Sequence, residues 1–570
     1  MPFLLLLLVS ISLHGQSILS VSPSGNGAGL EPLIRVQFSG PIDPNTLRDR
    51  ISIEWGEPQQ TAGFSTYPTG YRMPINQVAW DPATNTAYVK PDEALEHDRN
   101  YTVHISNFLT DHVTHFHTKN VTSTILARDL GPAGSLRPLS NGIIDLNEVQ
   151  SISLLNQTSA DEKATLSETA FPVPPAFLST LGLRRMAFFR YESPRGDTVD
   201  VHAWIPNSPA PRGGYPVVLV GHGLTDHRFS GPTIIASSVI AKSVVLSINA
   251  VGHGYGPASK IRFDTKSGET ILLPAAGRGI DLNHDQVIAP GEGCIVMTGE
   301  LPDFIDRCLR ETALDYRKLV REIQQGIDLD GDGTSDLDPN KIQYIGQSLG
   351  AMYGTILLAI EPGIEAGVLN VGGGSTIETA RTSTVLRPLL QQYVAAVAPA
   401  LADLPDPLTA RYQPAQLLTD PRSGPYLELL DRLSTAGTEA APASFAPFLK
   451  QATLYGNPIK RVLFQYALGD QYVANSANGQ LIRAAFEYDL VSLYRHDLAK
   501  KAIPSLPGDP HIFLVGFADF SQPGSLLIAL ASLAQAGAFL DSGLREVPDV
   551  NAIVRGYFGT NLFEVPSFIP

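Results

Sequence analysis

From about residue 185 onward, the chain alternates short apolar runs with segments that are long enough to form helices. The runs are almost continuously hydrophobic, as is typical of strands that are buried on both faces of a parallel sheet. We therefore expect residues 185–570 to form an α/β domain with an eight-stranded, mostly parallel sheet, whose first two strands form an antiparallel hairpin. The expected strands are 185–193, 197–206, 215–221, 243–249, 342–346, 366–372, 461–468 and 490–496.

Residues 18–120 have a different pattern, with short alternating runs separated by turn residues such as "DPATN" and "SGPIDPNT". This spacing predicts a small all-β sandwich. Because no acid, base and nucleophile cluster in it, we expect a spacer or binding role. The expected strands are 34–38, 51–55, 77–81, 86–91, 101–106 and 113–118.

Two further segments lie outside these patterns. Residues 121–184 are rich in Pro, Ser and Thr, and we interpret them as a linker that wraps onto the α/β domain. Residues 373–460 are too long for a simple crossover and carry helical patterns, so they predict a helical insertion that caps the sheet.

The first 17 residues, MPFLLLLLVSISLHGQS, contain an apolar run that is too short to span a bilayer and is followed by small residues. We expect a signal peptide and a secreted, periplasmic or cell-surface protein. A buried first strand is the alternative. We expect no later segment to be long and apolar enough to cross a membrane. Cys294 and Cys308 are the only two cysteines, and in an exported chain we expect them to pair.

The whole chain has a formal net charge of −15, which argues against a nucleic acid or an anionic membrane as partner. Its 570 residues are 43% hydrophobic, enough for two or more cores. The sequence does not determine the oligomeric state.

The stretch "KIQYIGQSLGAMYG" places Ser348 in a Gly-x-Ser-x-Gly pattern between an expected buried strand and an expected helix. Glycines on both sides let strand and helix approach closely, so the serine hydroxyl projects from a sharp turn. We interpret Ser348 as a nucleophile; a simple glycine-rich turn is the alternative. The amides of Leu349 and Leu224 are the candidate oxyanion donors, and His222 is expected to hold the loop of Leu224 rather than to transfer protons.

A serine nucleophile needs a base and an acid, which chain order places after the last two strands. Asp470 directly follows the expected strand 461–468, although a turn or helix-capping role is the alternative. Two histidines follow the last strand, and His511, on a Pro/Gly loop, is favoured over His496. His253 follows the fourth strand, where a base would be unusual.

The segment "DLDGDGTSDLD" has the oxygen-ligand spacing of a calcium loop, although Pro339 stands where a bidentate Glu would complete it. We predict a structural calcium there; a solvated acidic connector is the alternative. A second segment, 281–292, repeats part of the pattern, but Gln286 replaces the usual glycine. No cofactor is expected for the chemistry itself. The predicted ligands are Asp328, Asp330, Asp332 and Asp336.

These motifs together resemble the α/β-hydrolase-fold esterases and lipases, and more narrowly the bacterial exported virulence-factor lipase-like proteins with an N-terminal Ig-like domain. The likeness is carried by "PIDPNTL", "VGHGLTDHR", "DLDGDGTSDLDPNKIQYIGQSLG" and "YRHDLAKKAIPSLPGDPHIFLV". It implies an α/β-hydrolase fold and carboxylic ester hydrolysis with Ser348, Asp470 and His511 as the triad. Met352 and Tyr353 are bulkier than usual after the serine, which could narrow the acyl pocket.

Three functions follow from these observations. The leading hypothesis is a secreted serine esterase or lipase acting on an ester or lipid substrate. The second keeps the chemistry but makes the substrate a polyester or cell-wall ester, with the sandwich binding the polymer. The third is a non-enzymatic, calcium-dependent surface-binding protein on a hydrolase scaffold.

Overall fold

The structure is a computed structural model of the chain. The residues that it describes are 16–56, 70–106, 111–235, 237–295, 305–329, 332–406, 408, 415–451, 453–454, 456–515, 522–543 and 545–570. The expected signal peptide therefore lies almost entirely outside the described residues. Asp330, one of the predicted calcium ligands, also lies outside them. The chain divides into two compact units, of which the first comprises residues 1–60, 67–119 and 404–431, and the second comprises the remainder.

The first unit is a β-sandwich of two five-stranded sheets, and all six strands expected in it are present. In the strands 34–38, 51–55 and 100–105, alternate residues point into a shared core around Trp55, Trp80 and Tyr101. One sheet is β1(Ile18–Ser22), β3(Ile34–Phe38), β7(Thr86–Pro91), β6(Ile75–Asp81) and β21(Gln416–Leu417). The other is β2(Gly25–Ala28), β9(His112–Thr118), β8(Asn100–Ile105), β4(Ile51–Trp55) and β5(Arg72–Met73), with the short helix α1(Leu47–Arg50) before β4.

Part of the expected cap belongs to this sandwich. Residues 404–431 cluster with the first unit, where β21 pairs with β6 and extends its sheet. Leu418 and Leu427 pack beside Tyr88, and the Asp431 carboxylate accepts the Leu33 amide at 2.7 Å. The interpretation of 373–460 as one continuous cap was therefore wrong, because helical periodicity does not reveal which core an apolar face joins.

The second unit is built on a ten-stranded mixed sheet. Its central strands are parallel, and the eight expected strands are all present, but two further strands lie at its edges. In spatial order the sheet is β10(Arg137–Asp145), β13(Leu183–Glu192), β14(Thr198–Pro206), β16(Val244–Ile248), β15(Tyr215–Gly221), β19(Leu337–Gln347), β20(Ile364–Asn370), β22(Arg461–Ala467), β23(Val491–Tyr494) and β24(Phe563–Glu564).

The segment 121–184 is not a linker. It supplies β10 to the main sheet, and it supplies two strands to a separate four-stranded sheet. Edge strands carry more polar residues than central strands, so β10 lacked the apolar run that marks a buried strand. The four-stranded sheet is β12(Ser167–Ala170), β11(Val149–Asn156), β17(Lys260–Thr265) and β18(Thr270–Pro274), and the segment also holds α2(Thr122–Leu126) and α3(Pro175–Thr180).

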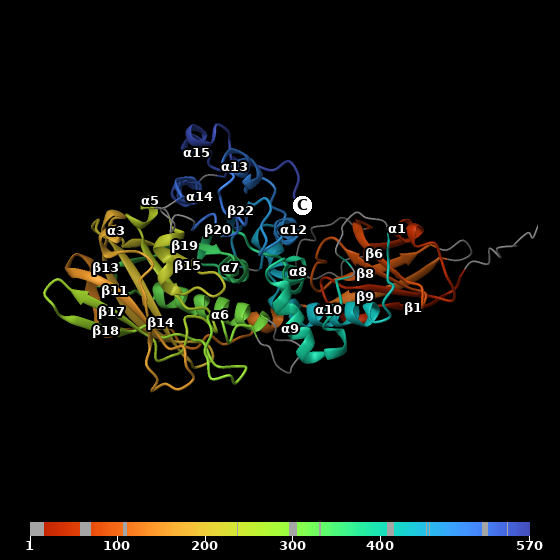
Figure 1. The fold of residues 1–570 in the computed structure, drawn as a ribbon, viewed down its shortest axis with the longest axis horizontal. Helices are drawn as coiled ribbons and strands as arrows, with labels where there is room; N and C mark the ends of the chain where they lie inside the picture. The colour runs from red at the N-terminus through yellow and green to blue at the C-terminus, as the bar shows by residue number, and fades with distance from the viewer. Residues whose placement is uncertain are drawn as a thin grey trace, which may run out of the picture. The chain divides into compact units, whose positions relative to one another are not determined.

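Helices cover both faces of the large sheet (Figure 1). On one face, Leu533 and Phe539 of α14(Pro523–Ser542) belong to the same apolar cluster as Val218 and Val220 of β15. On the other, Tyr316 of α6(Asp306–Gln324) stacks on Tyr353 of α7(Leu349–Ile360). The remaining helices are α4(Gly231–Ile234), α5(Ser237–Ile240), α8(Thr376–Thr382), α9(Arg387–Val397), α10(Ser423–Gly437), α11(Pro442–Phe445), α12(Asn475–Ala484), α13(His496–Ala502) and α15(Asn551–Phe558).

Helix α14 also corrects an expectation about membranes. Among the described residues, the helical segment Pro523–Asp541 is long and apolar enough to cross a bilayer, judged by length and composition alone. Its mean hydropathy is 1.5. Within the structure, however, 61% of this window is buried. Burial of that kind is typical of the core helix of a globular domain.

Candidate active site

Ser348 occupies the sharp turn between β19 and α7, in a backbone conformation that side chains rarely adopt, with φ 55° and ψ −117°. A Cβ at Gly346 would lie 2.3 Å from the Gly350 oxygen, and one at Gly350 would lie 2.1 Å from the Gly221 oxygen. Both positions therefore require glycine. The close approach of β15, β19 and α7 holds the serine in a conformation that costs about 1–3 kcal/mol.

Ser348, His511 and Asp470 form one continuous hydrogen-bonded chain. The Nδ1 atom of His511 lies 2.8 Å from Asp470 Oδ2, and its Nε2 atom lies 2.9 Å from Ser348 Oγ. Since an ionised carboxylate can only accept, Nδ1 carries the proton and Nε2 is left to accept the serine hydroxyl. His511 is 5% exposed and Asp470 6%, so this pair is shielded from water, whereas Ser348 is only half-buried.

The backbone after β22 fixes the orientation of Asp470. Its Oδ1 accepts the amides of Tyr472 and Val473, both at 2.9 Å. The Tyr472 ring stacks on His511, with centroids 4.8 Å apart and planes at 21°. Sequence reasoning missed Tyr472, whose only signal was an aromatic residue two positions after a candidate acid.

The other candidate base, His496, is held elsewhere. It begins α13, and its Nδ1 lies 3.1 Å from the hydroxyl of Tyr494. Burial lowers the pKa of His496. Of the two histidines that follow β23, the structure thus brings only His511 to the Ser348 hydroxyl.

The two candidate oxyanion donors flank the serine. Leu349 is the first residue of α7, so its amide is one of the four at a helix N-terminus that have no acceptor within the helix. Leu224 lies on the loop after β15, and both leucines line the same small cavity as Ser348. The adjacent Gly223 approaches the serine closely, because a Cβ there would lie 3.5 Å from Ser348 Cβ.

Two buried histidines support the loop of Leu224. His222 donates from Nδ1 to the Gly223 oxygen at 2.9 Å, and its Nε2 accepts the Ala250 amide at 3.0 Å. Its ring lies 5.2 Å from that of His253, which donates to the Val251 oxygen. Burial lowers the pKa of both histidines to about 3, so both are neutral at ordinary pH. The contacts of His222 are those of a residue that holds a loop.

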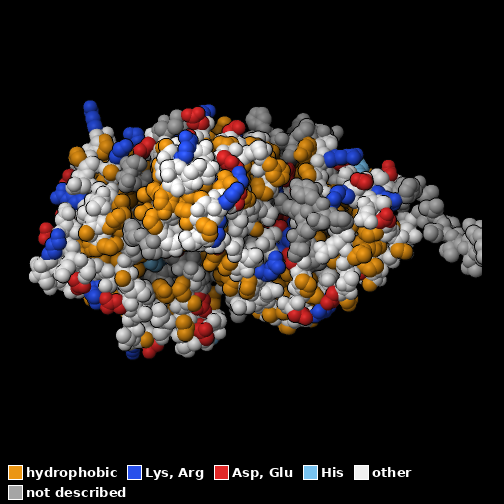
Figure 2. All heavy atoms as spheres, turned by 45° about the horizontal axis from the view of Figure 1, so that its top comes forward, with side chains coloured by type: hydrophobic (Ala, Val, Ile, Leu, Met, Phe, Trp, Pro, Cys, Tyr) orange, Lys and Arg blue, Asp and Glu red, His pale blue; other side chains and the backbone are white. Residues whose placement is uncertain are grey.

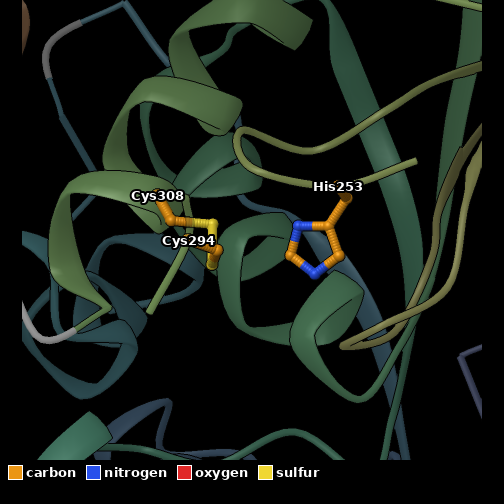
Figure 3. Close-up of side chains that lie close together, drawn as sticks. All are labelled: His253, Cys294 and Cys308. Atoms are coloured by element: carbon orange, nitrogen blue, oxygen red, sulfur yellow. A yellow bond between two sulfur atoms is a disulfide. The ribbon is translucent and has the colours of Figure 1, made fainter. Parts of the chain in front are cut away.

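Cys294 and Cys308 form a disulfide, which confirms the predicted pairing. The imidazole of His253 lies beside it (Figure 3). In the part of the chain that the structure describes, this trio is the one group of His, Cys and acidic side chains close enough to hold a metal. Because a disulfide sulfur is not a thiolate, the trio does not form a metal site in this state.

The acidic loops fold back on their own amides. Asp328 accepts the Gly333 amide at 2.8 Å, and Asp332 accepts the Thr334 amide at 2.8 Å. Asp336 turns inward to accept the Leu329 amide at 2.6 Å. Carboxylate oxygens retain lone pairs after such bonds, so this donor set still suits calcium.

In the second acidic loop, Gln286 has φ 69°. It therefore takes the left-handed conformation that glycine usually supplies at this position. The loop thus makes this turn with Gln286 in place of the usual glycine.

The surface gives no sign of a single-charge interface on the face shown in Figure 2. Acidic and basic side chains are interspersed there, with hydrophobic side chains between them.

One part of the chain matches a known protein family, and solved structures resemble the chain only loosely. Residues 15–124 match the bacterial Ig-like domain family. Acetyl xylan esterase 1 from Thermoanaerobacterium sp. JW/SL YS485 is 14% identical over 61% of this chain and 84% of that chain, with a TM-score of 0.35. Acetyl xylan esterase from Paenibacillus sp. R4 is 12% identical over 66% and 85%, with a TM-score of 0.38. The Pyrobaculum calidifontis esterase is 14% identical over 65% and 90%, with a TM-score of 0.34.

No curated protein matches the chain. The sequence identities and TM-scores of these solved structures are too low to indicate what this protein does. A bacterial Ig-like domain and a disulfide are consistent with an extracellular protein.

Proposed function

We propose that this protein is an exported serine hydrolase that cleaves carboxylic esters on an α/β-hydrolase scaffold. One observation carries the proposal: the buried His511 imidazole lies between the Ser348 hydroxyl and the Asp470 carboxylate, within hydrogen-bond distance of both. A hydroxyl that donates to a carboxylate-oriented imidazole is the arrangement that activates serine.

In the proposed mechanism, Ser348 Oγ attacks the ester carbonyl while His511 Nε2 takes its proton. The amides of Leu224 and Leu349 stabilise the negative charge that develops on the carbonyl oxygen. His511 then protonates the leaving alcohol, and Asp470 stabilises the imidazolium between these steps. Water, activated by the same imidazole, cleaves the acyl-enzyme and restores the serine.

We also propose that the protein is related to the virulence-factor lipase-like proteins and that a signal peptide exports it. We propose further that a calcium ion binds the loop of Asp328 and Asp332. In that loop, calcium would brace the connection between α6 and β19, the strand that ends at Ser348. The chemistry of the three side chains requires no metal.

The test is covalent labelling of the full chain with a fluorophosphonate probe, together with p-nitrophenyl ester turnover. Ser348→Ala should abolish both and leave the circular dichroism spectrum unchanged. Ser532→Ala is the matched control: its buried hydroxyl only donates to the Ile528 carbonyl, so labelling and turnover should persist. Labelling or turnover by Ser348→Ala would remove this serine from the mechanism.

A further inference from the structure

His511, the proposed base, is carried by a loop rather than by a helix or a strand. It begins a turn, residues 511–515, and its backbone amide donates to Asp509 at 3.1 Å. A side chain on a loop is held less precisely than one on a regular element, unless neighbouring groups lock its conformation. The orientation of this imidazole therefore depends on what the ring itself contacts.

Two hydrogen bonds hold the ring within its own plane. Its Nδ1 atom lies 2.8 Å from Asp470 Oδ2, and its Nε2 atom lies 2.9 Å from Ser348 Oγ. Hydrogen bonds at a ring nitrogen lie in the plane of the ring, because the N–H bond and the lone pair both point that way. They fix the positions of the two nitrogens, but they oppose tilting of the ring about the line that joins them only weakly.

Tyr472 contacts the face of the imidazole, where no hydrogen bond acts. The two rings stack with centroids 4.8 Å apart and planes at 21°. The Tyr472 amide also donates to Asp470 at 2.9 Å, so one short stretch of backbone positions both the acid and the stacking ring. The Tyr472 side chain is 37% exposed and is therefore not a core residue. Its ring restrains the imidazole in the direction that the hydrogen bonds leave free.

The restraints on the imidazole change during the proposed reaction. Once Ser348 is acylated, its Oγ atom is an ester oxygen without a proton, so its hydrogen bond to Nε2 is lost. The ring is then bonded only at Nδ1, to Asp470, while Nε2 must still take a proton from the attacking water. The stack with Tyr472 does not involve the serine, so it remains when the second hydrogen bond has gone.

We propose that Tyr472 is a positioning residue, which holds the His511 ring in place above all while Ser348 is acylated. The inference rests on the proposed ester hydrolysis and concerns its second half. In that step the water oxygen bonds to the acyl carbon as Nε2 takes the proton of the water. The bond from the acyl carbon to Oγ then breaks, and the proton passes to Oγ.

Loss of the stack should therefore slow deacylation more than acylation. During acylation the Ser348 hydroxyl still holds Nε2, so the ring keeps both of its hydrogen bonds. An aromatic pair changes an equilibrium between two arrangements by about two- to tenfold, which sets the scale of the effect.

The experiment measures kcat and kcat/KM of the full chain for p-nitrophenyl acetate. Because p-nitrophenolate leaves readily, deacylation limits kcat, whereas kcat/KM reports acylation. In Tyr472→Leu, which removes the ring, kcat should fall about tenfold and kcat/KM less than about threefold, with a burst of p-nitrophenol before the steady state. Tyr472→Phe keeps the ring and should restore both values.

Tyr557→Leu is the matched control. This tyrosine is 50% exposed and packs edge-on against Phe558 in α15, so its loss should leave kcat and kcat/KM unchanged. An equal fall of kcat and kcat/KM in Tyr472→Leu, or an unchanged kcat, refutes the role of the ring. Failure of Tyr472→Phe to restore the values, or the same loss in Tyr557→Leu, refutes it as well.

Fluorophosphonate titration of Ser348 completes the experiment. It counts the active sites of each variant, so a partly unfolded preparation cannot imitate a slow deacylation step. It also separates the two proposals. If the wild type is labelled and Tyr472→Leu gives a contrary result, only this inference is lost, whereas absence of labelling in the wild type removes both.

Discussion

Replacing Asp470 with Asn tests the proposed chemistry most directly, because it changes one atom's hydrogen-bonding role and little else. Asp470 uses Oδ1 to accept the amides of Tyr472 and Val473, while Oδ2 accepts Nδ1–H of His511. In Asp470→Asn, the amide oxygen can still accept both backbone amides. The NH₂ group then faces His511 and can only donate.

The imidazole of the variant must therefore place its proton on Nε2 and present Nδ1 to the asparagine. Nε2–H then donates to Ser348 and cannot take its proton. Loss of the correct tautomer in such an arrangement lowers kcat by about 10⁴-fold, or about 5 kcal/mol of transition-state stabilisation. The fold should persist, since the backbone contacts of residue 470 are kept.

The assay is kcat/KM for a short p-nitrophenyl ester, with thermal unfolding of the same preparation. Asp509→Asn is the matched control, because this carboxylate accepts the backbone amide of His511 at 3.1 Å and does not contact its ring. It should retain at least about a third of the activity. A loss of less than tenfold in Asp470→Asn, or an equal loss in Asp509→Asn, would refute the assignment of Asp470.

Three further predictions concern the serine turn, the sandwich and the acidic loop. Gly350→Ala should abolish ester turnover and lower the unfolding temperature, because the alanine Cβ would lie 2.1 Å from the Gly221 oxygen. Turnover by this variant at the wild-type rate would show instead that α7 can shift. Burial raises the pKa of Asp431 to about 6, so its contribution to stability is full below about pH 4 and is lost as pH rises towards 6. Thermal scans between pH 4 and 7 should show this decline, and Asp431→Asn should flatten it. Removal of calcium with a chelator should lower the unfolding temperature, and Asp332→Ala should cancel that effect; an equal shift in the variant would place the ion elsewhere.

The division of the chain also affects how one can test the hypothesis that the sandwich binds a polyester or cell-wall ester. Deleting residues 18–120 would expose Leu418 and Leu427, which pack beside Tyr88 of the sandwich. Loss of activity after such a deletion would then reflect an unpaired apolar surface as readily as lost polymer binding. Substitutions on the exposed face of the sandwich avoid this ambiguity.

Local pattern alone determined where the central strands and the serine turn lie. The central parts of β15, β19, β20 and β22 are buried on both faces, so their sequences had to be mostly apolar, and glycines had to flank Ser348 where strand and helix touch. Chain order placed an acid and a histidine after the last strands, because parallel strands present their carboxyl ends at one edge.

Tertiary structure decided the rest, because contacts between distant residues leave no periodic trace. His496 and His511 both follow β23, and only the path of the loop brings the second to the serine. The same holds for residues 404–431, whose apolar faces suited either core. Sequence periodicity specifies which residues are buried, whereas the packing of the chain determines what each buried group meets.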